Sequence, residues 1–537
     1  MGSKAYDPRG VETYPWQPDQ GDGTYRNPVL LADYSDPDVI RVGEDFYLTA
    51  SSFNCTPALP ILHSRDLVNW TIVGHAMENL PLSRYDTPQH AGGVWAPALR
   101  EHDGLFYIFF PLADEGIFVV TAPGPTGPWS PPHCVQEGAG LIDPCPLWDD
   151  GGRAYLVHAY AHSRTGIKHR LRVCPMAPDG SRLLGEGRIV FDDPLRQPGM
   201  EGPKFLKRDG LYYILAPAGG VSGGWQVALR SRDVYGPYEA QTVLEQGSTA
   251  VNGPHQGALV DTRSGQWWFL HFQSTGPYGR IVHIQPVRWQ DGWPLMGRDQ
   301  DGNGVGEPVL RHEKPDAERG SAVTIPQTSD EFNGTTLGLQ WQWYANHRQE
   351  WYSLSARPGW LRLHAQGLEG GDFTQVPNLL LQKFPARTFA VQTQVELAAL
   401  HGRAGLIVIG AEYAALVIQA NGQGGKLVML INGAEVFAAS LAAPAARLAV
   451  SVADGGLCRF AYAAGDGHLE PVGPEFPSVK GRWIGAKVGL FCIAPPLISL
   501  GGPSDRSGRR GASLSDVKGQ PSGHADFDHF RFGAALE

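Results

Sequence analysis

The sequence predicts an all-β protein in which a five-bladed β-propeller precedes a β-sandwich. A short motif recurs five times in the first 310 residues, and the final ~210 residues carry alternating strand patterns. Glycine (68) and proline (43) are abundant, which favours many short strands joined by tight turns over long helices. At 537 residues the chain is too long for one ordinary core, so two or more domains are expected.

The recurring motif is a polar turn with glycine, followed by an aromatic-rich strand. Its copies begin at Gly43, Gly104, Gly151, Gly210 and Gly265, at intervals of 47 to 61 residues. Aromatic and β-branched residues are typical of strands. Because a repeat of about 50 residues with several strands is typical of a propeller blade, five copies predict five blades.

A further short strand precedes each of these turns, and its leading residue is polar or aromatic in every copy. The leading residues are Asp36, Trp95, Asp143, Glu201 and His255. Since the first strand of a blade usually lines the central channel, we expect these side chains to converge at one channel mouth. An isolated Asp-Pro is often only a turn, but three carboxylates in equivalent inner positions are hard to explain as packing, because buried charge is costly.

Three converging carboxylates suit the hydrolysis of a glycosidic bond. One carboxyl protonates the leaving oxygen, and a second either activates water or attacks the sugar. A third carboxylate can keep the acid protonated, because a nearby negative charge raises a carboxyl pKa. The sequence contains no distance between the carboxylates, so this reasoning leaves inverting and retaining mechanisms both open.

Charge and hydropathy narrow the class of partner and the compartment. A net charge of −10 and a pI near 6.0 argue against nucleic acid and fit a neutral substrate. No apolar stretch approaches the ~20 residues that span a bilayer. We expect a cytoplasmic protein, or a periplasmic or secreted one if a signal peptide preceded Met1 in the natural protein. A monomer and a homo-oligomer both remain open.

Six cysteines lack CxxC or metal-finger spacing, and we interpret them as mostly buried thiols.

An ordered set of motifs runs through most of residues 25–310. They are Asn27-Pro28, Asp36–Asp38, Ser51–Phe53, Leu59–Trp70, Gly92–Pro97, Ile142–Pro144, Glu201–Pro203 and Asp291–Pro294. Together they resemble glycoside hydrolase family 43, particularly its β-xylosidase branch. The resemblance implies a five-bladed propeller and inversion at the anomeric carbon. By motif, it implies Asp36 as general base, Glu201 as general acid, and Asp143 as the residue that tunes and orients that acid.

The resemblance also implies a set of sugar-contacting residues. Phe53 and Trp95 match aromatic walls of a sugar pocket, and Arg280 matches an arginine that the family places against the sugar near the last blade. His255 matches a channel histidine that holds a water molecule or, in some members, a calcium ion. No organic cofactor is expected.

The C-terminal part changes character after a polar linker. We divide the chain into an N-terminal extension (1–24), the propeller (25–310), a linker (311–327) and the sandwich (328–537). Alternating patterns typical of a two-sheet sandwich occur in Gly359–His364, Phe389–Leu397 and Gly405–Gly410. Ser329–Gly334 and Ala525–Phe530 resemble the terminal strands of the concanavalin-like, lectin-like sandwich fused to family xylosidases. In that resemblance Asp330 and Asp526 could bind structural calcium, although such aspartates are more often only solvated.

Two features of the sandwich depart from the related xylosidases. Those proteins place a phenylalanine near the pocket from a sandwich loop, and the matching segment here, Arg482–Gly489, has Lys487 where an aromatic is often found. A Gly- and Ser-rich insertion follows at about residues 500–523, as is common for loops. Both departures concern recognition of the leaving group.

These observations predict an inverting exo-hydrolase that acts on an oligosaccharide and releases D-xylose from xylo-oligosaccharide ends. The closest alternative is α-L-arabinofuranosidase activity, alone or alongside xylosidase activity, because both pentoses can present similar atoms to one small pocket. A non-catalytic glycan-binding propeller is a further alternative, against which the three carboxylates argue.

Overall fold

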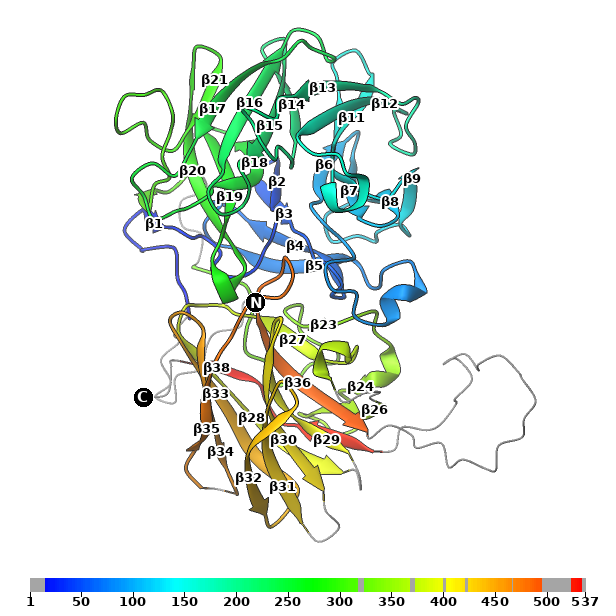
Figure 1. The fold of residues 1–537 in the computed structure, drawn as a ribbon, viewed down its shortest axis with the longest axis vertical. Helices are drawn as coiled ribbons and strands as arrows, with labels where there is room; N and C mark the ends of the chain where they lie inside the picture. Colours follow the sequence, from blue (N-terminus) through cyan, green and yellow to red (C-terminus); the bar gives the residue numbers. More distant parts are fainter. Residues whose placement is uncertain are drawn as a thin grey trace, which may run out of the picture.

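The computed structural model describes residues 15–316, 323–367, 372–398, 402–420, 424–465, 467–494 and 523–533. Five four-stranded antiparallel sheets form the first part, and two eight-stranded sheets form the second (Figure 1). The prediction of an all-β chain with a five-bladed propeller and a C-terminal sandwich is therefore confirmed. No helix in the described ranges is long and apolar enough to cross a membrane.

Each blade consists of four consecutive strands, paired in chain order. The blades are β2 (Asp38–Val42), β3 (Asp45–Thr49), β4 (Ala58–Ser64) and β5 (Thr71–Met77); β6 (Ala98–His102), β7 (Leu105–Leu112), β8 (Gly116–Ala122) and β9 (His133–Glu137); β10 (Leu141–Trp148), β11 (Ala154–Tyr160), β12 (Arg170–Met176) and β13 (Arg188–Asp192); β14 (Lys204–Arg208), β15 (Leu211–Ala218), β16 (Trp225–Ser231) and β17 (Glu239–Leu244); β18 (His255–Asp261), β19 (Trp267–Ser274), β20 (Arg280–Gln290) and β21 (Trp293–Met296).

The first strands of the blades lie next to one another around the centre. β2 contacts both β6 and β18, and β10 contacts both β6 and β14. The glycine motif forms the hairpin between the first two strands of a blade. In the second and fourth blades, Asp103-Gly104 and Asp209-Gly210 both have positive φ, the geometry of the Asp-Gly hairpin turn that suits twisted strands. The repeated glycine is thus a turn requirement.

The ring is tied together where its ends meet. β1 (Thr24–Arg26) pairs with β22 (Arg311–Glu313), and the Asn27 side chain hydrogen-bonds to the backbone of Ile284 in the last blade. Arg41 of the first blade forms an ion pair with Asp261 of the last, at 3.0 Å. These contacts join segments that are more than 200 residues apart.

The sandwich consists of two sheets whose inner faces are apolar. One contains β23 (Gln342–Trp343), β26 (Gln366–Gly367), β27 (Leu380–Lys383), β29 (Arg403–Ile409), β30 (Tyr413–Ala420), β31 (Gly425–Ile431), β32 (Ala434–Leu441) and β36 (Lys487–Ala494). The other contains β24 (Tyr352–Ser353), β25 (Leu361–His364), β28 (Phe389–Ala398), β33 (Ala445–Ala453), β34 (Leu457–Ala463), β35 (Glu470–Pro477), β37 (His524–Phe527) and β38 (Arg531–Gly533).

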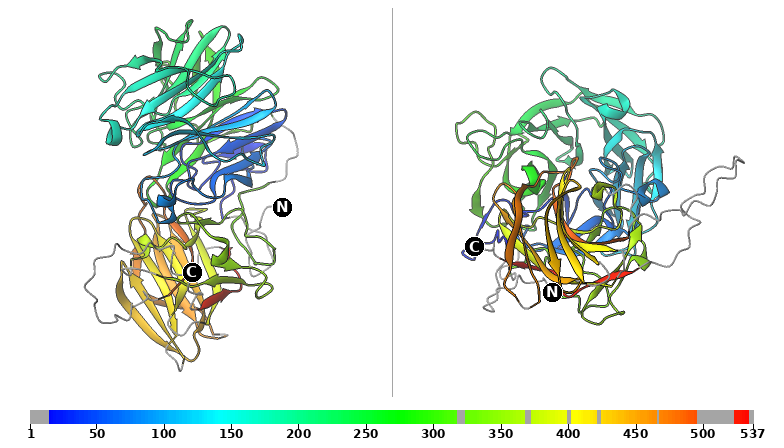
Figure 2. Two further views of the ribbon diagram at one scale, coloured as in Figure 1. Left: turned by 90° about the vertical axis from the view of Figure 1, so that its right-hand side faces the viewer. Right: turned by 60° about the horizontal axis from the view of Figure 1, so that its bottom comes forward.

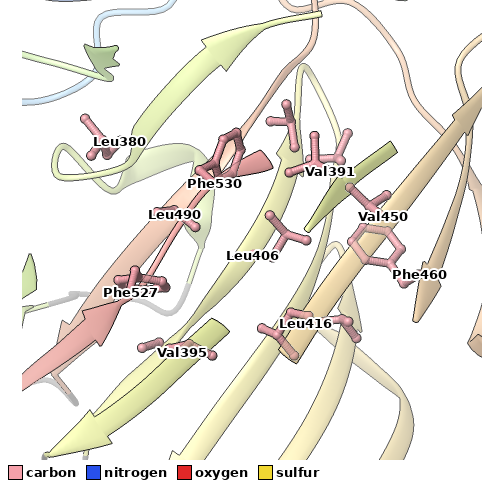
Figure 3. Packing of buried hydrophobic residues seen from close by; sticks show 14 of the residues in the cluster. Leu380, Val391, Val395, Leu406, Leu416, Val450, Phe460, Leu490, Phe527 and Phe530 are labelled. Carbon is pink, nitrogen blue, oxygen red and sulfur yellow. The ribbon is translucent and has the colours of Figure 1, made fainter. Parts of the chain in front are cut away.

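Side chains from both sheets interdigitate between them. Leu406 and Leu416 of one sheet lie in the same buried cluster as Val450 and Phe460 of the other (Figure 3). Along β28 buried residues alternate with more exposed ones, as expected for a strand with one face toward a core. The helical segments are short: η1 (Ser83–Asp86), α1 (His162–Thr165), η2 (Gly276–Tyr278), η3 (Gln349–Trp351) and η4 (Phe373–Gln375).

The sandwich packs against one side of the propeller (Figure 2). Thr56 of the first blade forms a backbone bridge to Trp343, and the Asn54 amide donates a hydrogen bond to the Tyr344 carbonyl at 2.6 Å. Phe53 shares a buried apolar cluster with sandwich residues that include Tyr344. The propeller side that meets the sandwich is therefore closed by apolar packing and backbone pairing.

Candidate active site

The backbone is left-handed where four of the five inner strands begin. Asp36 has a φ of 54°, Asp143 of 56°, Gly202 of 58° and Gln256 of 38°. The last two residues directly follow Glu201 and His255. The strand register also shifts at Asp143 in β10 and at Gln256 in β18. Such bulges re-aim side chains, and positive φ in residues other than glycine clusters at functional sites.

The Asp36 carboxylate is held by both of its oxygens. Oδ1 accepts a hydrogen bond from Nη1 of Arg280 at 2.6 Å, and Oδ2 accepts one from the Ser51 hydroxyl at 2.6 Å. Asp36 is only 4% exposed. Because each carboxylate oxygen has two lone pairs, a water molecule can still bind to this fixed group. Asp36 can therefore act as an oriented proton acceptor.

Asp143 and Glu201 form an interacting pair beside it. Asp143 accepts a hydrogen bond from the Gly202 backbone at 2.7 Å, and burial together with the charge of Glu201 raises its pKa. Burial, with a contribution from the Asp36 charge, also raises the pKa of Glu201, while Arg280 and Lys168 oppose that rise.

The Glu201 side chain is 34% exposed, so solvent screening moderates the rise of its pKa. Two neighbouring carboxyls with raised pKa values favour a protonated group at this place, as a general acid requires.

His255 lies against this pair and is neutral. Its side chain is 0% exposed, its Nε2 lies 3.7 Å from Oε1 of Glu201, and burial lowers its pKa to about 3. Neither ring nitrogen has a hydrogen-bond partner among the described residues. Among all the residues that the structure describes, no group of three or more His, Cys, Asp or Glu side chains could hold a metal ion. The imidazole fits a water molecule, or an ion whose other ligands are mostly water.

Arg280 joins the propeller site to the sandwich. Its guanidinium lies 4.6 Å from the ring centroid of Phe272 and 5.9 Å from that of Trp483, whose residue is 40% exposed. The aromatic that the sandwich brings to Arg280 is thus Trp483. Lys487 of the same segment is 2% exposed and reaches Gln342 instead.

The two aromatic residues predicted as walls differ in exposure. Trp95 is partly buried, and the guanidinium of Arg164 lies 5.0 Å from its ring centroid. Phe53 is only 2% exposed, and its backbone pairs with Val94. A Cβ on Gly93 would lie 2.0 Å from the Phe53 carbonyl oxygen, so only glycine allows this approach. The ring of Phe53 belongs to the buried cluster against which Trp95 packs, and it leaves little surface for a ligand.

Sequence reasoning missed Asp33, which links Arg280 to the sandwich. Its Oδ1 accepts a hydrogen bond from the Arg280 backbone, and its Oδ2 accepts one from the Gly485 backbone, both at 2.9 Å. Sequence reasoning also missed Ser51 and Lys168. Ser51 contacts Asp36 within the first blade and Lys168 acts on Glu201 from the neighbouring blade, and neither contact leaves a mark in the repeat pattern.

A layer of paired charges lies just beyond the site residues on the inner strands. Asp38 is 0% exposed and accepts a hydrogen bond from Arg100 at 2.7 Å, while Nζ of Lys204 lies 3.4 Å from its other oxygen. Lys204 also donates to the Pro97 carbonyl at 2.7 Å. Each of these charges lies beside a group of opposite charge.

The two sandwich aspartates already have hydrogen-bond donors. Asp526 accepts hydrogen bonds from Arg362 at 2.7 and 2.9 Å, and Asp330 accepts one from Nε1 of Trp341 at 2.9 Å. A carboxylate covered by a guanidinium is not available to a cation, so Asp526 does not fit a calcium site. Residues 500–522 of the predicted insertion lie outside the described residues.

All six cysteines are free, and five of them are buried.

Comparisons with known proteins agree with this geometry. The family model "Glycosyl hydrolases family 43" matches residues 25–294, and "Beta xylosidase C-terminal Concanavalin A-like domain" matches residues 329–499. A putative beta-xylosidase of Xylanibacter ruminicola is 41% identical over 90% of this chain and 88% of its own. A non-reducing end alpha-L-arabinofuranosidase of Bacteroides ovatus is 33% identical over 74% of this chain and 77% of its own.

A solved structure extends the similarity to the whole fold. The crystal structure of a variant of the GH43 protein BlXynB from Bacillus licheniformis has a TM-score of 0.79 and 27% identity. It covers 96% of this chain and 100% of its own. Propeller and sandwich are therefore shared as one arrangement.

Proposed function

The chain belongs to glycosyl hydrolase family 43, and on this basis we propose that it is an exo-acting, inverting hydrolase that releases terminal xylose from xylo-oligosaccharides. The observation that carries the proposal is a fixed carboxylate, Asp36, whose charge acts on two carboxyls of raised pKa, Asp143 and Glu201. One group is oriented to accept a proton and the other pair is able to supply one. Inverting hydrolysis needs this combination.

In the proposed reaction, Asp36 takes a proton from a water molecule as the water attacks the anomeric carbon. Arg280 and Ser51 keep the carboxylate aimed during this step. Glu201 donates its proton to the leaving oxygen as the glycosidic bond breaks. Before this step, Asp143 keeps Glu201 protonated. The released sugar then carries the water oxygen on the opposite face, so its configuration is inverted.

The neighbouring residues suggest how the sugar is held. We propose that Trp95 contacts the face of the terminal sugar, that Arg280 donates hydrogen bonds to its hydroxyls, and that His255 holds a water molecule below it. Trp483, from the sandwich, would contact the sugar on the leaving side. These roles use only side chains of this chain and water, and no organic cofactor enters the reaction.

Xylose is the first choice of substrate because several relatives are named for it. The Xylanibacter ruminicola relative and a beta-xylosidase of Formosa agariphila, 32% identical over 88% of this chain, cover most of both domains. Arabinofuranosidase activity is the second candidate, and the Bacteroides ovatus relative favours it.

Hydrolysis of 4-nitrophenyl β-D-xylopyranoside and 4-nitrophenyl α-L-arabinofuranoside separates these candidates. We expect higher kcat/KM on the xyloside. Turnover of the arabinoside alone would replace xylose by arabinose in the proposal, and binding of xylo-oligosaccharides without turnover of either substrate would favour the glycan-binding alternative. Proton NMR during hydrolysis of a β-xyloside should show α-xylose first; initial β-xylose would contradict inversion.

A further inference from the structure

A small cavity lies between the first blade and the sandwich, and none of the proposed catalytic residues lines it. Its volume is about 60 Å³. Pro60 of β4 and Ile72 of β5 line it from the propeller, and Lys383 lines it from β27, which Figure 1 shows on the propeller-facing side of the sandwich. Val29, Leu31 and Pro385 extend its apolar wall.

Lys383, which lines the cavity, faces a second lysine, Lys487, which is not among the lining residues. Lys383 of β27 and Lys487 of β36 are direct cross-strand partners, an arrangement in which like charges destabilise a sheet. Both ammonium groups donate to one oxygen, Oε1 of Gln342, at 3.2 and 3.4 Å. Burial and the charge of Lys487 lower the pKa of Lys383 to about 7.

No carboxylate in the described ranges forms an ion pair with either lysine. Asp33 is the acidic residue whose charge acts on Lys383, but its oxygens accept hydrogen bonds from the backbone of Arg280 and Gly485. Gln382 also lines the cavity and is 3% exposed, and its Nε2 has no hydrogen-bond partner among the described residues. The cavity therefore offers the Gln382 N–H and the Lys383 ammonium to a ligand, while Oε1 of Gln340, which also lines it, is a buried acceptor without a hydrogen-bond partner among the described residues.

We propose that this cavity binds a small aliphatic carboxylate, whose oxygens accept hydrogen bonds from Lys383 and Gln382 and whose alkyl group packs on the apolar wall. A water molecule needs about 10–15 Å³ of such volume, so the cavity suits a ligand of roughly acetate or propionate size. A phosphate would bring further oxygens against the apolar wall without partners. The proposal is independent of the hydrolase activity.

Calorimetric titration of the full chain at pH 7 tests this site, with sodium acetate and sodium propionate as probes at constant ionic strength. We expect both carboxylates to bind one site and to raise the Tm. Lys383→Met should weaken acetate binding at least tenfold. Lys426→Met is the matched control, because Lys426 is an exposed lysine of the same sandwich paired with Glu435, and it should bind acetate as the wild type does.

Lys487→Met provides a second variant. It removes one of two opposed buried charges, so its Tm without carboxylate should equal or exceed that of the wild type, while its response to acetate should fall. Equal responses to acetate, acetamide and sodium chloride, stronger binding of phosphate than of acetate, or undiminished binding in Lys383→Met would each overturn the proposal. Acetate should not compete with a xyloside, and a Glu201→Gln protein should bind it normally, so this site and the hydrolase proposal can fail separately.

Discussion

The sandwich interior and the propeller channel are both buried, but the sandwich interior contains apolar side chains and the channel contains carboxylates. Leu416 and Val450 are 0% exposed in an apolar cluster drawn from two sheets, whereas Asp36 and Asp143 are 4% and 6% exposed at the starts of inner strands. The sandwich residues lie in regular strands, while both aspartates have left-handed backbone. The low exposure of a residue therefore does not identify its role; its backbone conformation and hydrogen-bond partners do.

The difference follows from how the two regions are built. Alternation along a strand gives a sandwich one continuous apolar face. A propeller centre receives the start of one strand from each blade, so single polar side chains from distant segments can meet there. Buried charge at such a place is costly unless it is paired or used. We expect the channel to govern activity and the sandwich interior to govern stability.

The largest expected effect is a loss of kcat when either of two channel carboxyls, Asp36 or Glu201, is replaced. The size of this loss should depend on the leaving group for Glu201 but not for Asp36. Asp36→Asn should lower kcat about 10²–10⁴-fold on all substrates, because no other base is placed for the water. Glu201→Gln should lower kcat by a similar factor on xylobiose but much less on a nitrophenyl xyloside, whose leaving group needs little protonation. Both variants should keep the wild-type Tm or exceed it.

Steady-state kinetics on the two substrates measures this contrast. The exposed Glu239, paired with Arg230, offers Glu239→Gln as a control that should leave kcat unchanged. Wild-type turnover of xylobiose by the Glu201 variant would show that the proton comes from elsewhere.

A smaller side chain in the sandwich interior should lower the stability of the protein and leave its turnover unchanged. Leu416→Ala leaves a cavity in the apolar cluster and should reduce the free energy of unfolding by about 2–5 kcal/mol. Urea denaturation measures that loss, and kcat/KM per folded molecule should stay at the wild-type value. A large fall in kcat/KM at full occupancy of the folded state would mean that the two regions are not separable in this way.

The carboxyl pair should also connect pH to both activity and stability. Since folding raises the pKa of Asp143 and Glu201, the folded state binds more protons than the unfolded state from about pH 4 up to the raised values. The free energy of unfolding should therefore fall as pH rises through this window, and kcat/KM should fall as Glu201 loses the proton that it donates.

Asp143→Asn sharpens this prediction. Without the negative neighbour, Glu201 should lose its proton at lower pH, so the alkaline limb of kcat/KM should move to lower pH. The pH slope of urea stability should become shallower. An unmoved alkaline limb would separate Asp143 from the control of the acid.

The smallest effect is expected where the two regions meet. Trp483→Ala removes an exposed aromatic near Arg280 without touching a carboxyl. We expect KM for xylobiose to rise several-fold, with kcat and KM for the nitrophenyl xyloside changed little, because a nitrophenyl group makes fewer of the contacts of a second sugar. Equal effects on both substrates would argue for a role of Trp483 in positioning Arg280.

Local patterns predicted a large part of the architecture. The glycine repeats predicted five blades because each blade has one hairpin turn between its first two strands, and in four of the five copies the repeated glycine has positive φ. The leading residues Asp36, Asp143 and Glu201 were found because equivalent positions in repeats have equivalent positions in space. The segment Arg482–Gly489 approaches the propeller, as the resemblance predicts, but its aromatic near Arg280 is Trp483 and position 487 carries a lysine.

Sequence periodicity by itself determined the number of blades, the presence of a sandwich and the three carboxylates, because these depend on hydrogen bonds and turns between near neighbours. Only the tertiary structure decided that Arg280 holds Asp36, that Trp483 lies near Arg280, and that Lys383 and Lys487 oppose each other. Those contacts join segments far apart in the chain. Their geometry depends on how blades and sheets pack, which no local pattern records.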